Sequence, residues 1–294
     1  MNASFGVDHP LMATHDIDAL RERLIALGFN TTAVGRHPWG TSTSLAMFEG
    51  CLLEIMGIYD STLIDEMPAG DFRFGRHVYE HLQRREGVAL TALHSTDSIL
   101  DAGQAEDAGF TVAGHLEFGR DVTLPNGDAG RTRTTLALLP DIHFPRLSFF
   151  LCQQHRPDLV YVPQWLEHPN KVNGICGLNI VADARFQPAL RARFGGLYHS
   201  ACESIEGGFQ CNTANGVMRV LNATAFENTI GDLPQALVGE GLPCVAGIDL
   251  VMSDPAVFSE FLKTSNAGCR DINNGYVLTS PSMTANTTLR FFSA

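Results

Sequence analysis

Apolar and polar residues follow one order of patterns that recurs four times along the chain. The first copy has an apolar, strand-like run over 5–14, and then a helical pattern. Asp16 stands where a carboxylate caps a helix, and Gly28 stands where a glycine ends one. The apolar stripe of this helix consists of Leu20, Leu24 and Leu27. Three strand-like runs complete the copy, at 31–35, 43–48 and 51–58.

The other three copies repeat this β-α-β-β-β order. They begin with strand-like runs at 88–93, 175–181 and 246–252. The expected helix starts and ends are Asp97 and Gly109, Asp183 and Gly195, and Asp254 and Gly268. Their closing runs are 132–139 with 147–152, 217–222 and 287–292. Because one such unit cannot bury its sheet face alone, we predict an α+β fold of four βαβββ modules that pair into two pseudo-symmetric halves.

Two segments outside the repeat set the domain limits. Residues 61–85 carry the apolar spacing of an extra helix, and 156–170 read as an ordered connector rich in proline and aromatic residues. A length of 294 residues also suits two domains. We therefore expect a first domain at 1–170, which holds the candidate site, and a second at 171–294, without a metal.

Composition and charge restrict the partners. Hydrophobic residues make up 45% of the chain and charged residues 18%, as in globular proteins. The formal net charge is -12 and there is no Lys/Arg cluster, which argues against binding to nucleic acid or to an anionic membrane. The expected partner is a small-molecule substrate or a second copy of the chain. Both a homodimer and a self-contained monomer are consistent with four units in two halves.

The cysteines and the N-terminus bear on location. Seven scattered cysteines without C-x-x-C spacing do not support a thioredoxin-like or zinc-ribbon site. The first residues lack the pattern of a signal peptide, and no apolar stretch reaches the roughly 18 residues of a membrane helix. We expect a soluble, cytoplasmic protein with reduced thiols.

The four serial βαβββ units resemble the vicinal oxygen chelate superfamily, which includes glyoxalase I, extradiol dioxygenases and bleomycin-resistance proteins. VDHPLMAT at 7–14 and CLLEIM at 51–56 resemble its first and fourth strands. Three further stretches resemble its glyoxalase-like branch: GRHPWGT at 35–41, FFLCQQH at 149–155 and WLEHPN at 165–170. The resemblance implies mixed, cup-shaped sheets.

The resemblance also implies a divalent metal ion in the cup of two paired units. His9 and Glu54 match the ligand positions of the first unit, and such a set suits Fe, Mn, Ni or Zn. In the second unit the position matching His9 is Leu90, which cannot bind a metal. The last strand of that unit offers His155 as a third ligand, or Gln153 in its place.

In the second half, Cys176 and either Gly247 or Asp249 match His9, and the last strand carries Arg290 instead of an acid. We expect no metal there.

Other side chains are candidates for the same pocket. Glu54 suits a base that stays near the metal, and His37 suits a proton shuttle. Trp39, Gln153 and His168 are expected to contact substrate.

A separate motif, His77-Val78-Tyr79-Glu80-His81, fits the H-x-x-E-H signature of inverted zinc peptidases. A peptidase of this kind would lose zinc when His77 is replaced, whereas His9 would not matter.

These observations leave two main hypotheses. The first is a divalent-metal-dependent enzyme, either a glyoxalase-like lyase or isomerase or an extradiol-type dioxygenase, acting on a small oxygen-chelating substrate. The alternative is a metal-free small-molecule binding protein of the bleomycin-resistance type, which the missing ligand at Leu90 supports.

Overall fold

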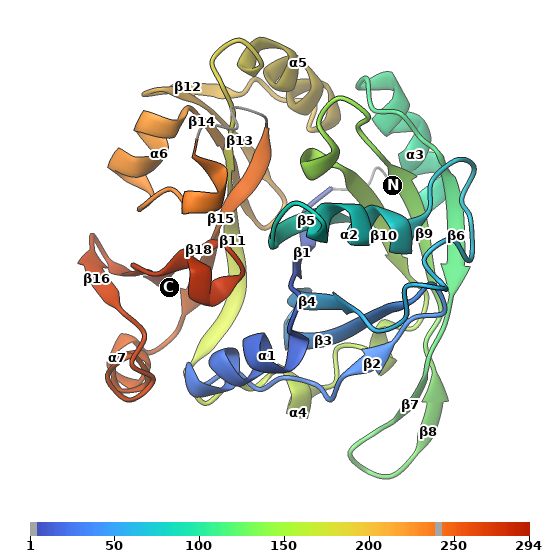
Figure 1. Cartoon of the computed structure of the whole chain (residues 1–294), viewed down its shortest axis with the longest axis horizontal. Helices are drawn as coiled ribbons and strands as arrows, with labels where there is room; N and C mark the ends of the chain where they lie inside the picture. Colours follow the sequence, from blue (N-terminus) through green and yellow to red (C-terminus); the bar gives the residue numbers. More distant parts are fainter. Residues whose placement is uncertain (1–4, 239–242) are drawn as a thin grey trace.

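The computed structural model describes residues 5–238 and 243–294, which form two curled eight-stranded sheets (Figure 1). The first sheet has the strand order β2-β3-β4-β1-β5-β10-β9-β6, and the second has the order β12-β13-β14-β11-β15-β18-β17-β16. The two orders are the same when strands are matched along the chain. The predicted pairing of four βαβββ modules into two pseudo-symmetric halves is therefore confirmed.

The strands of the first sheet are β1 (Val7–Ala13), β2 (Gly35–Arg36), β3 (Thr41–Phe48), β4 (Cys51–Ile58), β5 (Gly87–His94), β6 (Gly114–Phe118), β9 (Thr134–Leu139) and β10 (Phe149–Gln154). Those of the second are β11 (Val172–Val181), β12 (Glu203–Ile205), β13 (Gly208–Thr213), β14 (Gly216–Leu221), β15 (Cys244–Met252), β16 (Cys269–Ile272), β17 (Gly275–Leu278) and β18 (Thr288–Ser293). A separate two-stranded arm consists of β7 (Asp121–Thr123) and β8 (Ala129–Arg131).

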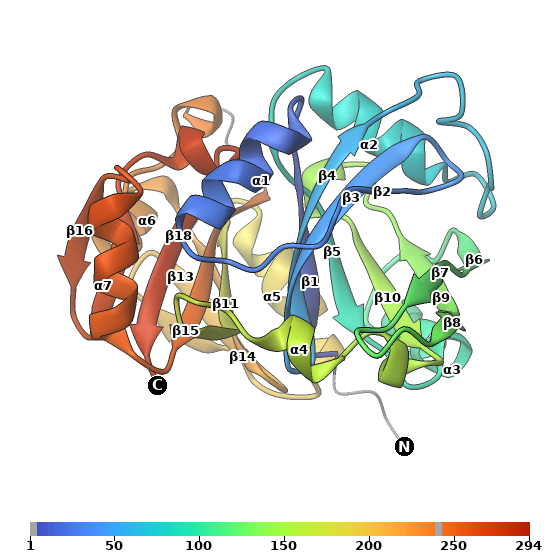
Figure 2. The same cartoon turned by 90° about the horizontal axis from the view of Figure 1, so that it is seen from below.

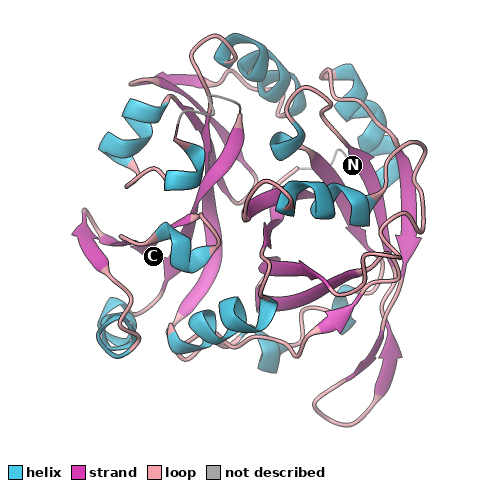
Figure 3. Ribbon diagram, in the orientation of Figure 1, coloured by secondary structure: helices cyan, strands magenta, loops and turns pink. Residues whose placement is uncertain are grey.

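Seven α-helices lie in the described part of the chain (Figure 3). They are α1 (Ile17–Ala26), α2 (Phe74–Leu82), α3 (Ser98–Asp107), α4 (Pro163–Leu166), α5 (Gln187–Leu197), α6 (Ala223–Thr229) and α7 (Pro255–Thr264). The 3-10 turns are η1 (Pro145–Leu147), η2 (Pro157–Leu159), η3 (Gln235–Leu237) and η4 (Pro281–Thr284). Among the residues described, no helix is long and apolar enough to cross a membrane.

Three of the four predicted helix starts are found. Asp16, Asp97 and Asp254 each accept hydrogen bonds from backbone N–H groups of the first turn. The prediction for Asp183 is wrong, because α5 begins only after Phe186. Gly28 and Gly109 have the left-handed backbone expected after a helix, with φ of 81° and 88°. In the other two copies, Gly195 lies inside α5, and after α7 it is Asn266 (φ 54°), not Gly268, that is left-handed.

Both halves contribute to one hydrophobic core. The two sheets lie side by side, with β4 against β11 and β5 against β15 (Figure 2). The ring of Phe29 lies 6.4 Å from that of Phe291, and the ring of Phe149 lies 6.0 Å from that of Phe194. The face of each sheet that is turned away from this core is concave. Apolar side chains of α2 pack into the first concave face, and those of α6 pack into the second.

The strand register relates the modules residue by residue. In the antiparallel pair β1–β5, His9 lies opposite Ala92 and Leu11 lies opposite Leu90. The pseudo-symmetry that places the first module on the second therefore makes Leu90 the counterpart of His9, as the sequence predicted, and Ala92 the counterpart of Leu11. Glu54 pairs with Leu11, and Phe150 pairs with Ala92. Phe150 is therefore the counterpart of Glu54.

One expectation about cysteine chemistry is wrong. Cys202 and Cys211 form a disulfide across the β12–β13 hairpin, whereas the sequence analysis predicted that all thiols are reduced.

Candidate functional site

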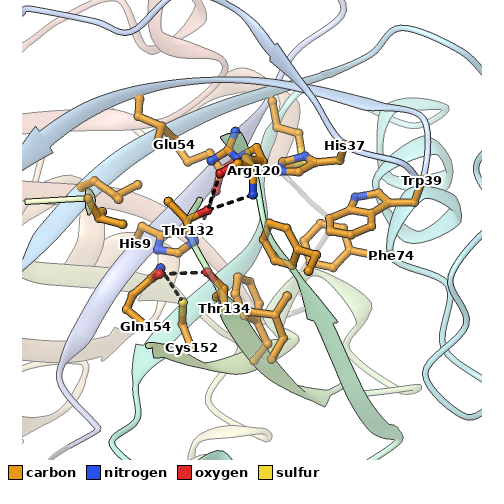
Figure 4. A pocket seen from close by; sticks show the side chains of 17 residues that line it. His9, His37, Trp39, Glu54, Phe74, Arg120, Thr132, Thr134, Cys152 and Gln154 are labelled. Carbon is orange, nitrogen blue, oxygen red and sulfur yellow. Dashed lines mark hydrogen bonds and ion pairs between the residues drawn. The ribbon is translucent and has the colours of Figure 1, made fainter. Parts of the chain in front are cut away.

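A cavity of about 70 Å³ opens in the concave face of the first sheet (Figure 4). Aromatic side chains form much of its wall, and a few polar groups converge on it. The polar side chains are His9, His37, Glu54, Arg120, Thr132, Thr134 and Gln154. The cavity therefore accommodates a small compound or the reactive end of a larger one.

His9 and Glu54 form the base of this cavity. His9 Nε2 lies 3.2 Å from Glu54 Oε2, and each residue is only 6% exposed. The parallel pairing of β1 with β4 brings these two side chains to the same face of the sheet. Thr43, on β3, donates a hydrogen bond to the other oxygen of Glu54. The pair that the sequence predicted is therefore brought together.

Asp8 is a third member of this group, and it was not among the residues predicted from the sequence. The register of β1 against β5 shifts between Val7 and His9, which leaves Asp8 in a bulge. Its Oδ1 lies 2.5 Å from His9 Nδ1, and its Oδ2 lies 3.5 Å from His94 Nε2. The available signal was an acidic residue inside an apolar strand, since a buried carboxylate needs a partner.

The charges of this group follow from burial and contacts. Burial alone would lower the pKa of His9, but the carboxylates of Asp8 and Glu54 outweigh burial and raise it to about 9. Burial alone would raise the pKa of Glu54, but the contacts with His9 outweigh it and lower that pKa to about 2. At neutral pH the base of the cavity therefore holds an imidazolium–carboxylate ion pair.

His37 and Trp39 line the cavity wall, on the loop between β2 and β3. Their rings stack with centroids 4.7 Å apart, and His37 Nδ1 lies 2.9 Å from Thr41 Oγ1. The loop turns at Gly40 (φ 80°), where a Cβ would stand 2.3 Å from the carbonyl oxygen of Asp60. Burial lowers the pKa of His37 to about 4, so its ring is neutral at the entrance to the ion pair.

The structure does not place Gln153 and His155 in the cavity. Gln153 Oε1 accepts from the backbone N–H of Ser98, and its Nε2 donates to the carbonyl oxygen of Thr96, so this side chain holds the start of α3. His155 Nε2 lies 2.8 Å from Thr135 Oγ1, just beyond the end of β10. The triad of His9, Glu54 and His155 is therefore not assembled.

The alternation of side chains along β10 explains why Gln153 and His155 lie outside the cavity. Phe149 packs into the core between the halves, so the odd-numbered residues of the strand face away from the cavity. Phe150, Cys152 and Gln154 face the cavity instead. Gln154 Oε1 accepts from Thr134 Oγ1, at 2.8 Å.

His168 is also outside the cavity. Its Nδ1 accepts from the backbone N–H of Asn30 at 2.9 Å, and its Nε2 lies 2.8 Å from the carbonyl oxygen of Met47. The ring packs between Phe29 and Phe48. His168 therefore joins the connector to β3 and to the loop that follows α1. Its position does not support the prediction that it contacts substrate in this cavity.

The donor set does not fit the metal centre that the resemblance implies. That centre draws one ligand from each of four related strands. Here the four register-related positions hold His9, Glu54, Leu90 and Phe150, so two of them have no donor atom. Within the described residues, the group that could hold an ion is Asp8, His9 and Cys152, whose donor atoms lie within 4.8 Å of one another. That group draws on Asp8, which does not line the cavity.

A charge cluster centred on the buried carboxylate of Asp249 lies in the second concave face. Asp249 Oδ1 accepts from Asn179 and Arg290, at 2.8 Å each, and its Oδ2 accepts from Arg219 and Arg290, at 2.7 Å each. In this half Asn179 pairs with Arg219 as Leu11 pairs with Glu54 in the first half, so Asn179 is the counterpart of Leu11. The counterpart of His9, two residues earlier, is therefore Gly177 and not Cys176. The guanidinium of Arg219 thus stands where the first half has a carboxylate.

The H-x-x-E-H motif lies on α2, where His77, Glu80 and His81 line a second cavity of about 110 Å³. Their donor atoms do not form one of the groups within 4.8 Å found among the described residues. His77 Nε2 lies 3.0 Å from the carbonyl oxygen of Ala89, and Glu80 is exposed and lies 3.9 Å from Arg76. This geometry does not direct two imidazoles and a carboxylate to one ion, so the peptidase hypothesis has no structural support.

Comparisons with known proteins agree with this architecture. Residues 7–194 match the protein family described as glyoxalase-like domain. A search of curated proteins gives no match. A hypothetical protein from Staphylococcus aureus has a similar crystal structure, with a TM-score of 0.68 and 10% identity over 98% of this chain and 99% of that one.

Two similar structures have named activities. One is a mutant of 4-hydroxymandelate synthase from Streptomyces coelicolor, with a TM-score of 0.59 and 12% identity over 100% of this chain and 93% of that one. The other is a xylose isomerase-like TIM barrel/4-hydroxyphenylpyruvate dioxygenase fusion protein, with a TM-score of 0.57 and 11% identity over 99% of this chain and 49% of that one. At these identities the likeness concerns the fold.

Proposed function

Since the chain belongs to the glyoxalase-like domain family, we propose that it is an enzyme that moves a proton within a small carbonyl compound, as a lyase or isomerase does. The observation that carries this proposal is the buried ion pair of His9 and Glu54 at the base of a small cavity. A charged acid–base pair of this kind is costly to bury without a use or a compensating contact.

The first step is binding. The carbonyl oxygen of the substrate accepts the hydrogen bond of His9 Nε2 and displaces Glu54 Oε2 from it. Asp8 holds the other nitrogen of His9 and thereby keeps the ring oriented and protonated. Glu54 stays buried but loses its contact with the imidazolium, so its affinity for a proton rises.

The second step is proton transfer. Glu54 Oε2 takes a proton from the carbon next to the carbonyl group, and the electrons of that C–H bond form a C=C bond. The carbonyl oxygen becomes an enolate oxygen, which the His9 imidazolium stabilises. Glu54 then returns the proton to the same carbon, which regenerates the carbonyl compound. Where that carbon carries a hydroxyl group, the hydroxyl proton can move to the enolate oxygen, and Glu54 can then protonate the former carbonyl carbon, which moves the carbonyl group by one carbon. In this scheme His9 supplies the positive charge that a metal ion supplies in related enzymes.

Metal dependence of the kind expected from the resemblance would require ligands beyond His9 and Glu54, and the donor set supports a reaction without a metal better. Leu90 and Phe150 also favour a second candidate, the metal-free binding protein, because neither side chain offers a donor atom for a metal ion. An enzyme would convert its ligand, whereas the binding protein would bind it without converting it.

Proton exchange tests the proposal. Small 2-oxo acids and aldehydes are incubated with the protein in D₂O, and ¹H NMR follows loss of the proton next to the carbonyl. We expect wild type to accelerate exchange, and Glu54→Gln to slow it by about a hundred- to ten-thousandfold. The matched control His155→Gln should exchange at the wild-type rate, because His155 lies outside the cavity.

Two outcomes would contradict the scheme. Exchange that stops after chelation and returns with a divalent metal would show a metal-dependent reaction. Saturable binding without exchange of any compound would favour the binding protein.

A further inference from the structure

Arg120 lines the cavity from the edge of the first sheet opposite to His37 and Trp39. β2 and β6 are the two edge strands of the first sheet, and the curl brings them together. The ring of Phe118, on β6, lies 5.6 Å from His37 and 5.1 Å from Trp39. Arg120 Nη1 lies 3.2 Å from the position that a Cβ on Gly35 would occupy. Arg120 is therefore one of the side chains that line the cavity, as Figure 4 shows.

The backbone of Arg120 is held firmly at the base of the β7–β8 arm. Its N–H donates to Thr132 Oγ1, and the N–H of Thr132 donates to its carbonyl oxygen, both at 2.9 Å. At the preceding Gly119, a Cβ would lie 2.2 Å from the carbonyl oxygen of Thr132, so the two strands of the arm approach closely here. This fixed backbone reduces the entropy lost when the side chain binds a ligand.

The charge of Arg120 is not matched by a protein carboxylate. Across residues 5–238 and 243–294 the structure gives its guanidinium no hydrogen bond or ion pair. At the base, by contrast, two carboxylates, those of Asp8 and Glu54, lie against the single ring of His9. The negative end of a ligand is therefore directed to the guanidinium of Arg120 and not to the base of the cavity.

We propose that Arg120 binds the carboxylate of a small oxo-monocarboxylate substrate whose carbonyl group points to His9. This assignment rests on the function proposed for the same cavity. The planar guanidinium matches a carboxylate through two parallel hydrogen bonds. A single cation suits one negative charge better than the two of a phosphate monoester. Both Arg120 and the ion pair line a cavity of about 70 Å³, so one compact molecule can reach both.

Binding can be measured through Trp39. The chain has two tryptophans, and Trp165 lies on α4, outside the cavity. In a Trp165→Phe background, 2-oxobutanoate should quench Trp39 fluorescence in a saturable way. We expect Arg120→Met to weaken this binding about tenfold or more, and Arg120→Lys to restore part of it. The uncharged methyl ester should bind to wild type and to Arg120→Met equally.

The control is Arg131→Met, because Arg131 is exposed on the same arm, pairs with Asp121 and lies outside the cavity. Its affinity for 2-oxobutanoate should equal that of wild type. Thermal unfolding of each variant identifies any that is misfolded, in which case Arg120→Lys and the ester comparison carry the test.

The outcomes separate this inference from the proposed function. If Arg120→Met binds 2-oxobutanoate as wild type does while Glu54→Gln still abolishes exchange, the anchor is wrong and the proposed function stands. If Arg120→Met loses affinity but Glu54→Gln exchanges normally, the anchor stands and the proposed function is wrong. Competition by inorganic phosphate as strong as that by acetate would overturn the choice of a carboxylate.

Discussion

At the scale of the residue, the contacts of each ring nitrogen determine what a histidine does here. His9 presents Nε2 to the cavity and to Glu54, whereas both nitrogens of His168 contact backbone groups. His155 uses one nitrogen on a threonine at the end of a strand. Sequence alone identified all three as candidates, because the residue type suits each role. Only the partners, which come from distant parts of the chain, distinguish them.

The predictability of the site residues depends on local alternation. His9, Glu54, His37 and Trp39 were predicted, and the structure brings them into one cavity. Cys152 and Gln154 were missed because β10 is buried on both faces, so FFLCQQ shows no alternation of apolar and polar residues. Arg120 was missed because it follows an edge strand and reaches the cavity only through the curl of the whole sheet.

The contacts of His168 predict a structural effect. Replacing it with alanine leaves the N–H of Asn30 and the carbonyl oxygen of Met47 without a partner, and it opens a space beside Phe48. We expect His168→Ala to lower the free energy of unfolding by about 2–4 kcal/mol, measured by urea denaturation. His155→Ala should change it by less than about 0.5 kcal/mol. An equal effect of both substitutions would contradict this interpretation.

At the scale of the element, the helix starts show how far local signals reach. The cap residue predicted the start of α1, α3 and α7 because an aspartate directly precedes each helix. In the third module the chain instead places a proline in the first turn of α5, where its fixed φ suits a helix start. The apolar spacing predicted α2, but not that it packs inside the concave face.

The packing of α2 predicts a sharp contrast between two glycines. A Cβ on Gly75, in α2, would stand 2.1 Å from the carbonyl oxygen of Trp39 and 2.9 Å from Cα of Ile64. Gly75→Ala should therefore push α2 away from the cavity wall. We expect a loss of about 1–3 kcal/mol of stability and a shift of the fluorescence of Trp39.

The matched control lies in α3. A Cβ on Gly103 meets no atom within 4 Å, so Gly103→Ala should stabilise the protein by about 0.5–1 kcal/mol through helix propensity. Thermal unfolding of the two variants measures both effects. If Gly75→Ala is as stable as Gly103→Ala, α2 is not held closely against the loop of Trp39.

At the scale of the whole molecule, the repeat explains why two halves of one design perform different tasks. Register-related positions hold an ion pair open to a cavity in the first half and a closed cluster around Asp249 in the second. The sequence revealed the repeat through its spacing. It could not reveal that the two sheets share a core, because contacts such as Phe29 with Phe291 join residues from opposite ends of the chain.

The shared core predicts that damage in one half is felt in the other. Asp249→Ala leaves the guanidinium of Arg290, which is 7% exposed, without its carboxylate partner. We expect a loss of about 3–5 kcal/mol of stability. Trp39 and Trp165 both lie in the first half, so their fluorescence reports on that half during urea denaturation. Because one core joins the halves, the transition they report should move to lower urea and remain a single step.

The control for this prediction is Asp121→Ala, which removes one partner of an exposed ion pair and should change stability by less than about 1 kcal/mol. Circular dichroism, which reports on both sheets, should give the same midpoint as fluorescence for Asp249→Ala. A tryptophan transition that stays at the wild-type midpoint, while circular dichroism shows an earlier step, would mean that the halves unfold independently. The second half would then not be required to hold β1 and β5 in place, and the cavity with its ion pair would depend on the first half alone.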